Sequence, residues 1–155
     1  MEQELNETEL YKMMGTRFIE YFPIAVQYEE IKLLTTHNTA VTVSTAYALT
    51  FVSKIRKRSI EVRLVKYEYH WRSYIKIAHL EEGHNLLDSD DYLEEYCGVE
   101  KANEKTKIDD YEGNTLSEKL ASYFRFLKTI LDSRFYDIME GKQWIDMPTN
   151  WHGYR

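Results

Sequence analysis

The feature that most constrains this chain is a block of alternating apolar and polar residues from Val41 to Leu80. Its three runs are VTVSTAYALTFVSKI, SIEVRLVKYEY and HWRSYIKIAHL. Side chains alternate between the two faces of a β-strand, so this pattern predicts strands. The segments between the runs are too short for the crossover that parallel strands need. The block therefore predicts an antiparallel meander at the centre of the fold.

The first strand of this block has two unlike faces. Val41, Tyr47 and Phe51 stand at odd positions, where most residues are large and apolar. Ala48 and its even-numbered neighbours are small. The bulky face is expected to lie on the apolar core, whereas the small residues suit either a closely packed helix or a partner surface.

A helix is predicted before the block, from Glu7 to Phe22, where apolar residues recur every three or four positions. Asn6 is expected to cap it, Glu9 completes a capping box, and Pro23 ends it. Residues 24–36 form either a strand or a short helix followed by a strand, because short apolar runs do not distinguish the two.

Three shorter polar segments predict a turn, a helix and a loop. Thr35 to Thr39 predicts a turn. Asp90 to Cys97 predicts a short helix that Ser89 caps and Gly98 ends. Residues 100–114 have no apolar period and are expected to form a surface loop.

The strongest helical signal comes last. Thr115 and Glu118 form a capping box, an apolar stripe follows as far as Met139, and Gly141 is placed to end the helix. This pattern predicts a single helix of about 25 residues, long enough to cross the sheet. We therefore expect one α+β domain, residues 1–155, in which the meander packs against the N-terminal helix and the long C-terminal helix.

Charge is unevenly distributed along the chain, whose formal net charge is −6. Residues 51–80 sum to +6, whereas residues 1–50 sum to −4 and residues 81–155 to −8. One predicted hairpin turn carries the basic residues Lys54, Arg56, Lys57 and Arg58. With tyrosines nearby for base stacking, this patch makes nucleic-acid binding one alternative function. The acidic flanks and a pI of about 5.4 count against it, and the other interpretation is a solvated hairpin.

Acidic side chains cluster after the predicted sheet, and we predict a partner-binding surface there. A dense negative field attracts a basic protein and speeds association. The predicted residues are Asp88, Asp90, Asp91, Glu94, Glu95, Asp109, Asp110 and Glu112. The 13 Tyr and 3 Trp of the chain add the residue types most enriched at binding hot spots.

Catalytic and metal signatures are absent from the sequence. It has no nucleophile elbow, Walker loop, zincin helix or dinucleotide glycine pattern. His79 and His84 stand near two glutamates, but no further histidine has the spacing of a third ligand. Cys97 lies among acidic residues that would raise the pKa of its thiol and make it a poor nucleophile. No metal or cofactor is expected, and a binding protein is favoured over an enzyme.

The sequence also predicts a location. A single cysteine cannot form an intramolecular disulfide, which fits a reducing compartment. The first residues, MEQELNETEL, are acidic where a secretion signal is basic and then apolar, and no apolar run approaches 18 residues. We expect a cytoplasmic protein without a membrane segment.

In outline, the whole chain resembles bacterial immunity proteins that neutralise toxins of polymorphic or contact-dependent systems. The resemblance lies in the small acidic domain, the central antiparallel sheet and the closing helix that runs into IMEGKQW, Ile138 to Trp144. Such proteins occlude the active site or substrate-binding surface of a toxin. The resemblance implies a non-catalytic inhibitor whose acidic residues face a basic toxin or effector domain.

Overall fold

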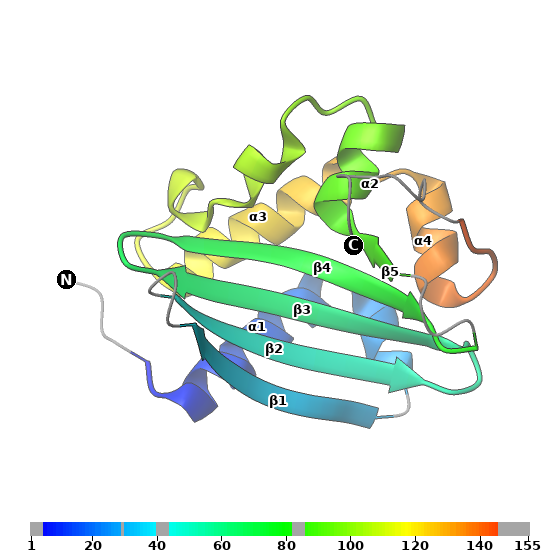
Figure 1. Cartoon of the computed structure of the whole chain (residues 1–155), viewed down its shortest axis with the longest axis horizontal. Helices are drawn as coiled ribbons and strands as arrows, with labels where there is room; N and C mark the ends of the chain where they lie inside the picture. Colours follow the sequence, from blue (N-terminus) through cyan, green and yellow to red (C-terminus); the bar gives the residue numbers. More distant parts are fainter. Residues whose placement is uncertain (1–4, 29, 40–43, 82–85, 146–155) are drawn as a thin grey trace.

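The computed structural model describes residues 5–28, 30–39, 44–81 and 86–145. It shows an α+β fold in which one antiparallel sheet carries helices on one face (Figure 1). In chain order, the elements are α1 (Glu7–Tyr21), the 3-10 helix η1 (Pro23–Gln27), β1 (Glu30–Thr39), β2 (Ser44–Ser53), β3 (Arg58–Tyr67), β4 (Trp71–His79), β5 (Leu86–Asp88), α2 (Ser89–Tyr96), the 3-10 helices η2 (Ala102–Thr106) and η3 (Ile108–Asp110), α3 (Leu116–Ile130) and α4 (Ser133–Glu140).

The strands form a meander in sequence order, β1-β2-β3-β4-β5, and every neighbouring pair is antiparallel. The predicted meander is confirmed and forms the middle of this five-stranded sheet. β2 is described from Ser44, and Val41, the predicted start, lies outside the described residues. The register aligns Leu49 of β2 with Val62 of β3, and Val62 with Ile75 of β4. Directly opposed residues share a face, so these side chains form one apolar surface.

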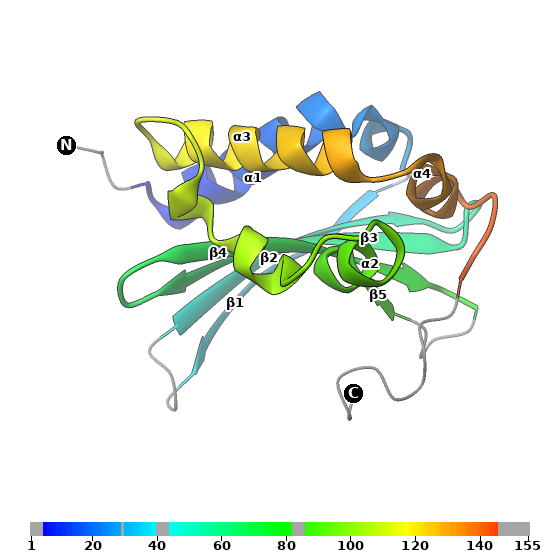
Figure 2. The same ribbon diagram turned by 90° about the horizontal axis from the view of Figure 1, so that it is seen from above.

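The core lies between that apolar surface and the helices. α1 and α3 lie side by side along this face (Figure 2). The ring of Phe18 in α1 stacks on Phe51 of β2 at a centroid distance of 5.7 Å and meets Phe124 of α3 edge-on at 5.5 Å. Because each aromatic ring buries a large apolar area, this trio ties both helices to the sheet.

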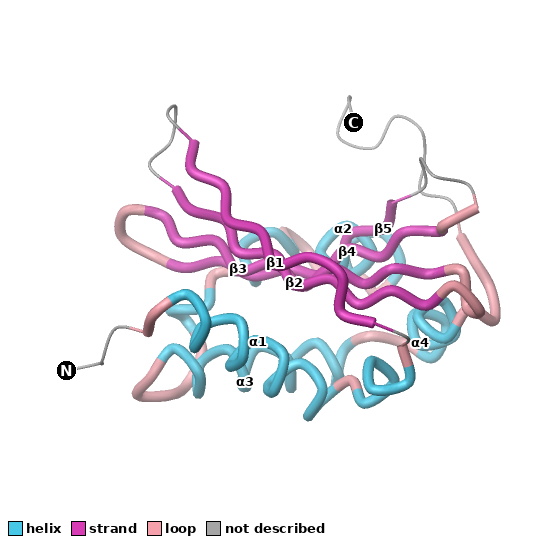
Figure 3. The backbone as a smooth tube through the Cα atoms, turned by 90° about the horizontal axis from the view of Figure 1, so that it is seen from below, coloured by secondary structure: helices cyan, strands magenta, loops and turns pink. Residues whose placement is uncertain are grey.

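The opposite face of the sheet carries the small residues of β2. Ala48 is 3% exposed and Thr50 is also buried, although no described helix covers this face (Figure 3). Arg63 of β3 donates hydrogen bonds to Glu61 Oε2 at 2.6 Å and to Tyr74 Oη of β4 at 3.3 Å. The face that carries the small residues of β2 is therefore a polar surface with its own ion pair, and not a second apolar core.

The predicted signals around α1 are confirmed. Asn6 Oδ1 accepts a hydrogen bond from the backbone N of Glu9 at 2.8 Å, and Glu9 Oε1 accepts one from the backbone N of Asn6 at 3.2 Å. Pro23 begins η1, and residues 24–36 hold the rest of η1 and most of β1. The predicted turn at Thr35 to Thr39 is wrong, because pairing with β2 keeps these polar residues extended.

The predicted short helix is confirmed as α2, but its start differs. Asp88 occupies the cap position, and Ser89, predicted to be the cap, is the first helical residue. Ser89 Oγ instead accepts a hydrogen bond from the backbone N of Ile75 in β4 at 3.0 Å. This buried bond fastens α2 to the sheet.

Two helices, α3 and α4, replace the single C-terminal helix, so the predicted length was wrong. α3 ends at Ile130, and Asp132 then caps α4 by accepting a hydrogen bond from the backbone N of Phe135 at 3.0 Å. The same carboxylate oxygen accepts a hydrogen bond from Tyr92 Oη of α2 at 2.6 Å. A capping side chain offers the backbone an alternative to helical hydrogen bonds, which explains the break.

Two substitutions should separate the roles of Asp132. Tyr92→Phe should lower the free energy of unfolding by about 1 kcal/mol, because it removes one hydrogen bond. Asp132→Ala should lower it by about 2 kcal/mol, because it removes both the α4 cap and the acceptor for Tyr92. Urea denaturation measures both losses. Equal losses would show that the cap contributes nothing of its own.

Candidate functional site

Negative charge is concentrated at one edge of the sheet. Residues 86–112 carry ten acidic and three basic side chains, a formal charge of −7, and all other residues sum to +1. They form β5, α2, η2 and η3, which stand together beside β4 (Figure 1). We call residues 86–112 the acidic edge. It contains all eight carboxylates that were predicted to bind a partner.

Contacts with β4 hold the acidic edge in place. Arg72 Nη1 donates hydrogen bonds to Asn103 O at 2.8 Å and to Thr106 Oγ1 at 2.9 Å. Asp109 Oδ2 accepts a hydrogen bond from the backbone N of the first β4 residue at 3.3 Å. Residues 100–114, expected to form a surface loop, are therefore fastened to the sheet.

Three of the predicted carboxylates are turned into the fold. Asp91 is 3% exposed, Asp88 Oδ1 lies 3.7 Å from Lys76 Nζ, and Asp90 is half-buried. Burial, followed by repulsion from Asp91 and Asp88, raises the pKa of Asp90 from 3.8 to about 6. These side chains lie at the start of α2, where the helix dipole favours negative charge.

Four of the predicted carboxylates are exposed: Glu94, Glu95, Asp110 and Glu112. Two of them, Asp110 and Glu112, line a shallow hollow of about 460 Å³ between the acidic edge and α3. The hollow is also lined by Tyr111 and Phe126, whose ring centroids lie 5.9 Å apart. Aromatic rings beside carboxylates can hold an Arg or Lys side chain through ion pairing and cation–π attraction.

Arg58 of the basic hairpin points into the fold. It is 3% exposed, its Nε donates a hydrogen bond to Ile138 O at 2.8 Å, and its Nη2 donates one to Gln143 O at 2.7 Å. The guanidinium also lies 5.1 Å from the ring centroid of Trp144. Burial lowers the pKa of Arg58. Its charge faces the C-terminal end of α4 and not the solvent.

Arg56 and Tyr28 complete a set of donors at the same helix end. Arg56 Nη1 donates a hydrogen bond to Glu140 O at 2.9 Å, and Tyr28 Oη donates one to Met139 O. With Arg58, they bind three consecutive carbonyl groups, which a helix end leaves short of intrahelical donors. We call Tyr28, Arg56 and Arg58 the α4 clamp. Sequence reasoning missed Tyr28, because it lies in the segment whose structure was left open.

Gly141 fits closely against the clamp. Its φ of 84° is left-handed, which confirms it as the residue that ends the last helix. A Cβ at this position would lie 2.6 Å from Arg56 O. Both the backbone angle and the available space therefore require glycine here.

The lysines of the basic hairpin lie at its tip and are exposed. Lys57 has a left-handed backbone, with a φ of 58°, and its Nζ lies 2.7 Å from Glu81 Oε1. Lys54 lies three residues before it. Tyr67, one of the rings considered for base stacking, already stacks on His70 at a centroid distance of 4.9 Å. The predicted basic patch is thus divided between two exposed lysines and two arginines of the α4 clamp.

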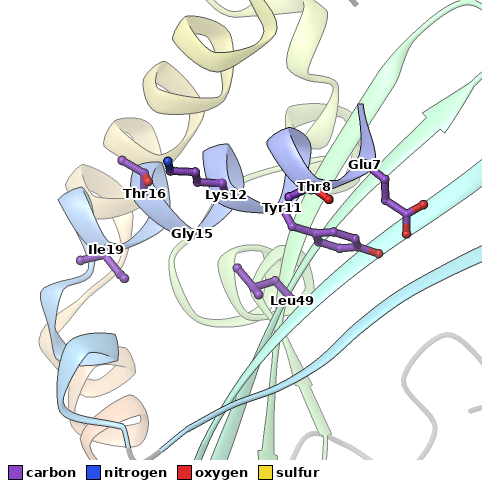
Figure 4. A pocket seen from close by; sticks show the side chains of 8 residues that line it. All are labelled: Glu7, Thr8, Tyr11, Lys12, Gly15, Thr16, Ile19 and Leu49. Atoms are coloured by element: carbon purple, nitrogen blue, oxygen red, sulfur yellow. The ribbon is translucent and has the colours of Figure 1, made fainter. Parts of the chain in front are cut away.

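A groove of about 800 Å³ lies between α1 and β2 (Figure 4). It is lined by Glu7, Thr8, Tyr11, Lys12, Gly15, Thr16, Ile19 and Leu49. Gly15 lets α1 approach the sheet closely here, since a Cβ would lie 3.2 Å from Leu49 Cδ2. The groove opens next to the sheet edge that β1 forms.

His79 and Cys97 are the two described residues among the histidine and cysteine candidates. His79 Nδ1 accepts a hydrogen bond from the backbone N of Glu81 at 3.3 Å, and His84 lies outside the described residues. Within the described part of the chain, no group of three His, Cys, Asp or Glu side chains is placed to hold a metal ion. The pKa of the Cys97 thiol is raised, the direction that the sequence predicted, but the main cause is burial, followed by repulsion from Asp132 and not from its neighbours in the sequence.

The chain matches no protein-family model, no curated protein and no solved structure. Among the residues that the structure describes, no helix is both long and apolar enough to cross a membrane. The function must therefore be inferred from the arrangement of the chain's own residues.

Removing the central donor of the α4 clamp should strongly destabilise the fold. Arg58→Met should lower the free energy of unfolding by about 3 kcal/mol, because it removes a buried charged donor that binds Ile138 O and Gln143 O. Lys57→Met, one residue away and exposed, should cause no measurable loss in the same urea titration. A similar loss in both variants would contradict an internal role for Arg58.

The raised pKa of Asp90 predicts a pH-dependent stability. The native state holds a proton that the unfolded chain releases above pH 3.8, so stability should fall as the pH rises from 4 through 6. In urea titrations across this range, the free energy of unfolding should fall by roughly 1 to 2 kcal/mol more in the wild type than in Asp90→Asn. Asp110→Asn, which changes an exposed carboxylate, should keep the wild-type profile. An unchanged profile in Asp90→Asn would contradict the assignment.

Proposed function

We propose that this protein is a non-catalytic inhibitor that binds a basic toxin or effector domain through the acidic edge, as bacterial immunity proteins do. The observation that carries the proposal is the separation of charge. Residues 86–112 hold −7, whereas the rest of the chain sums to +1. A field of one sign on one side of a protein steers an oppositely charged partner toward that side.

The exposed carboxylates supply this field, and the hollow beside them supplies a place for an anchor. Asp110, Glu112, Tyr111 and Phe126 line that hollow, and the exposed Arg125 of α3 lies at it too, so its charged groups sum to −1. An arginine or lysine of the partner entering it would gain ion pairs and ring contacts together, the combination found at binding hot spots. Coverage of a basic patch would exclude polyanionic substrates, whose binding depends on the same positive charge.

The α4 clamp also supports this proposal over nucleic-acid binding. Two arginines of the basic hairpin donate to backbone carbonyl oxygens of residues 138–143. Phosphate contacts need guanidinium groups that can leave such partners at little cost. The acidic edge has six exposed carboxylates, four of them among the predicted partner-binding residues, and needs no such rearrangement.

Charge reversal at the exposed carboxylates tests the proposal. The partner is the product of the neighbouring gene, which should co-purify with the wild-type protein. The quadruple variant Glu94→Lys, Glu95→Lys, Asp110→Lys, Glu112→Lys should weaken binding at least tenfold, mainly through a slower association rate. Kinetic binding measurements at low and high salt should show that the difference shrinks as salt screens the charges.

The control is Glu20→Lys, Glu68→Lys, which reverses two exposed carboxylates outside the acidic edge and is compared with the double variant Glu94→Lys, Glu95→Lys on it. It should change the affinity by less than about twofold, since exposed charges beyond a Debye length are screened. Equal effects of the two variants, or no binding of the neighbouring gene product by the wild type, would refute the proposal.

A further inference from the structure

The two edges of the sheet differ in length and in cover. β5 forms one edge with only three residues, Leu86–Asp88, and α2 follows it directly. β1 forms the other with ten residues, Glu30–Thr39, and pairs with β2 alone among the described strands (Figure 3). An edge strand presents a row of backbone N–H and C=O groups to which another strand can bind.

The sequence of β1 contains few of the features that protect an edge. EIKLLTTHNT has no proline, and its one glutamate and one lysine cancel. A register shift with β2 lies between Ile31 and Leu34, near one end, and Leu34 to Thr39 pair without interruption. Monomeric proteins guard such edges with charges, prolines, bulges or covering elements. Six consecutive residues of β1 therefore remain suited to strand pairing.

Charge placement decides which partner this edge can accept. The acidic edge lies at the opposite side of the sheet, four strand spacings or roughly 19 Å away. Two copies joined through β1 would hold their acidic edges roughly 40 Å apart, several times the Debye length at physiological salt. A second copy of this acidic chain can therefore approach here, with its own repulsive charge pointing outward.

We propose that the chain forms a homodimer in which β1 of each copy pairs antiparallel with β1 of the other, joining two sheets into one. Antiparallel pairing of identical edge strands is two-fold symmetric, so the assembly closes at two copies. The groove between α1 and β2 opens beside the same edge and adds apolar surface to the contact. Both acidic edges stay at the outer ends of the dimer, so the dimer does not depend on the proposed inhibitor function.

Light scattering coupled to size-exclusion chromatography tests the dimer. The wild type should have twice the chain mass of 18.6 kDa. In the backbone register, Thr35 and His37 pair with the small residues Ala48 and Ala46 of β2. The double variant Thr35→Lys, His37→Lys should run at the monomer mass, because it places like charges across the two-fold axis. Asn103→Lys, Asn114→Lys adds the same charge away from β1 and should stay dimeric.

Disulfide cross-linking locates the contact between the two copies. Each variant carries one introduced cysteine, and Cys97→Ser removes the native one. Thr36→Cys should give a covalent dimer under mild oxidation, whereas Glu94→Cys on the acidic edge should not. A wild type that runs at 18.6 kDa at every concentration up to the solubility limit would overturn the proposal. So would a dimer that survives both β1 lysines, or one that cross-links through residue 94 and not through residue 36.

Discussion

The fold depends on the hydrogen bonds that the carbonyl groups in the last turn of α4 receive. Carbonyl oxygens at a helix end lack intrahelical donors, and burying them without partners is costly. α4 has no basic residue in its own last turn. The donors come instead from Tyr28, which follows η1, and from Arg56 and Arg58 of the β2–β3 hairpin. The clamp thus joins the helical layer to the sheet at a point where neither layer could satisfy its polar groups alone.

The α4 clamp also changes how the positive charge of residues 51–80 is interpreted. Much of the positive charge in residues 51–80 has a partner within the protein: Arg58 binds carbonyl groups, Arg63 pairs with Glu61, and the exposed Lys57 pairs with Glu81 at the surface. The acidic edge keeps exposed carboxylates that a partner can reach. Residues 86–112 sum to −7 and the remaining residues to +1, so the charge of the molecule is concentrated on one side. This asymmetry links the fold to the proposed function.

Local sequence signals predicted most of the fold, whereas non-local contacts explain each error. The capping box of Asn6 and the alternation of the strands depend on residues a few positions apart, so the sequence reveals them directly. The break at Asp132 depends on a bond from Tyr92, forty residues away. The sequence predicted which segment holds the candidate site, but not which of its carboxylates are exposed. Asp90 and Glu94 have the same chemistry, and the packing of α2 on β4 decides which of them faces solvent.

The separation in sequence between the parts of the α4 clamp has a consequence for biosynthesis. Arg56 and Arg58 precede the carbonyl groups that they bind by 80 to 85 residues. A chain leaving the ribosome therefore presents a basic hairpin before its acceptors in residues 138–143 have been made. The sheet and α1 can pack early, but the α4 clamp cannot close until residue 143 emerges. During that interval the two guanidinium groups lack the carbonyl partners that hold them in the finished protein.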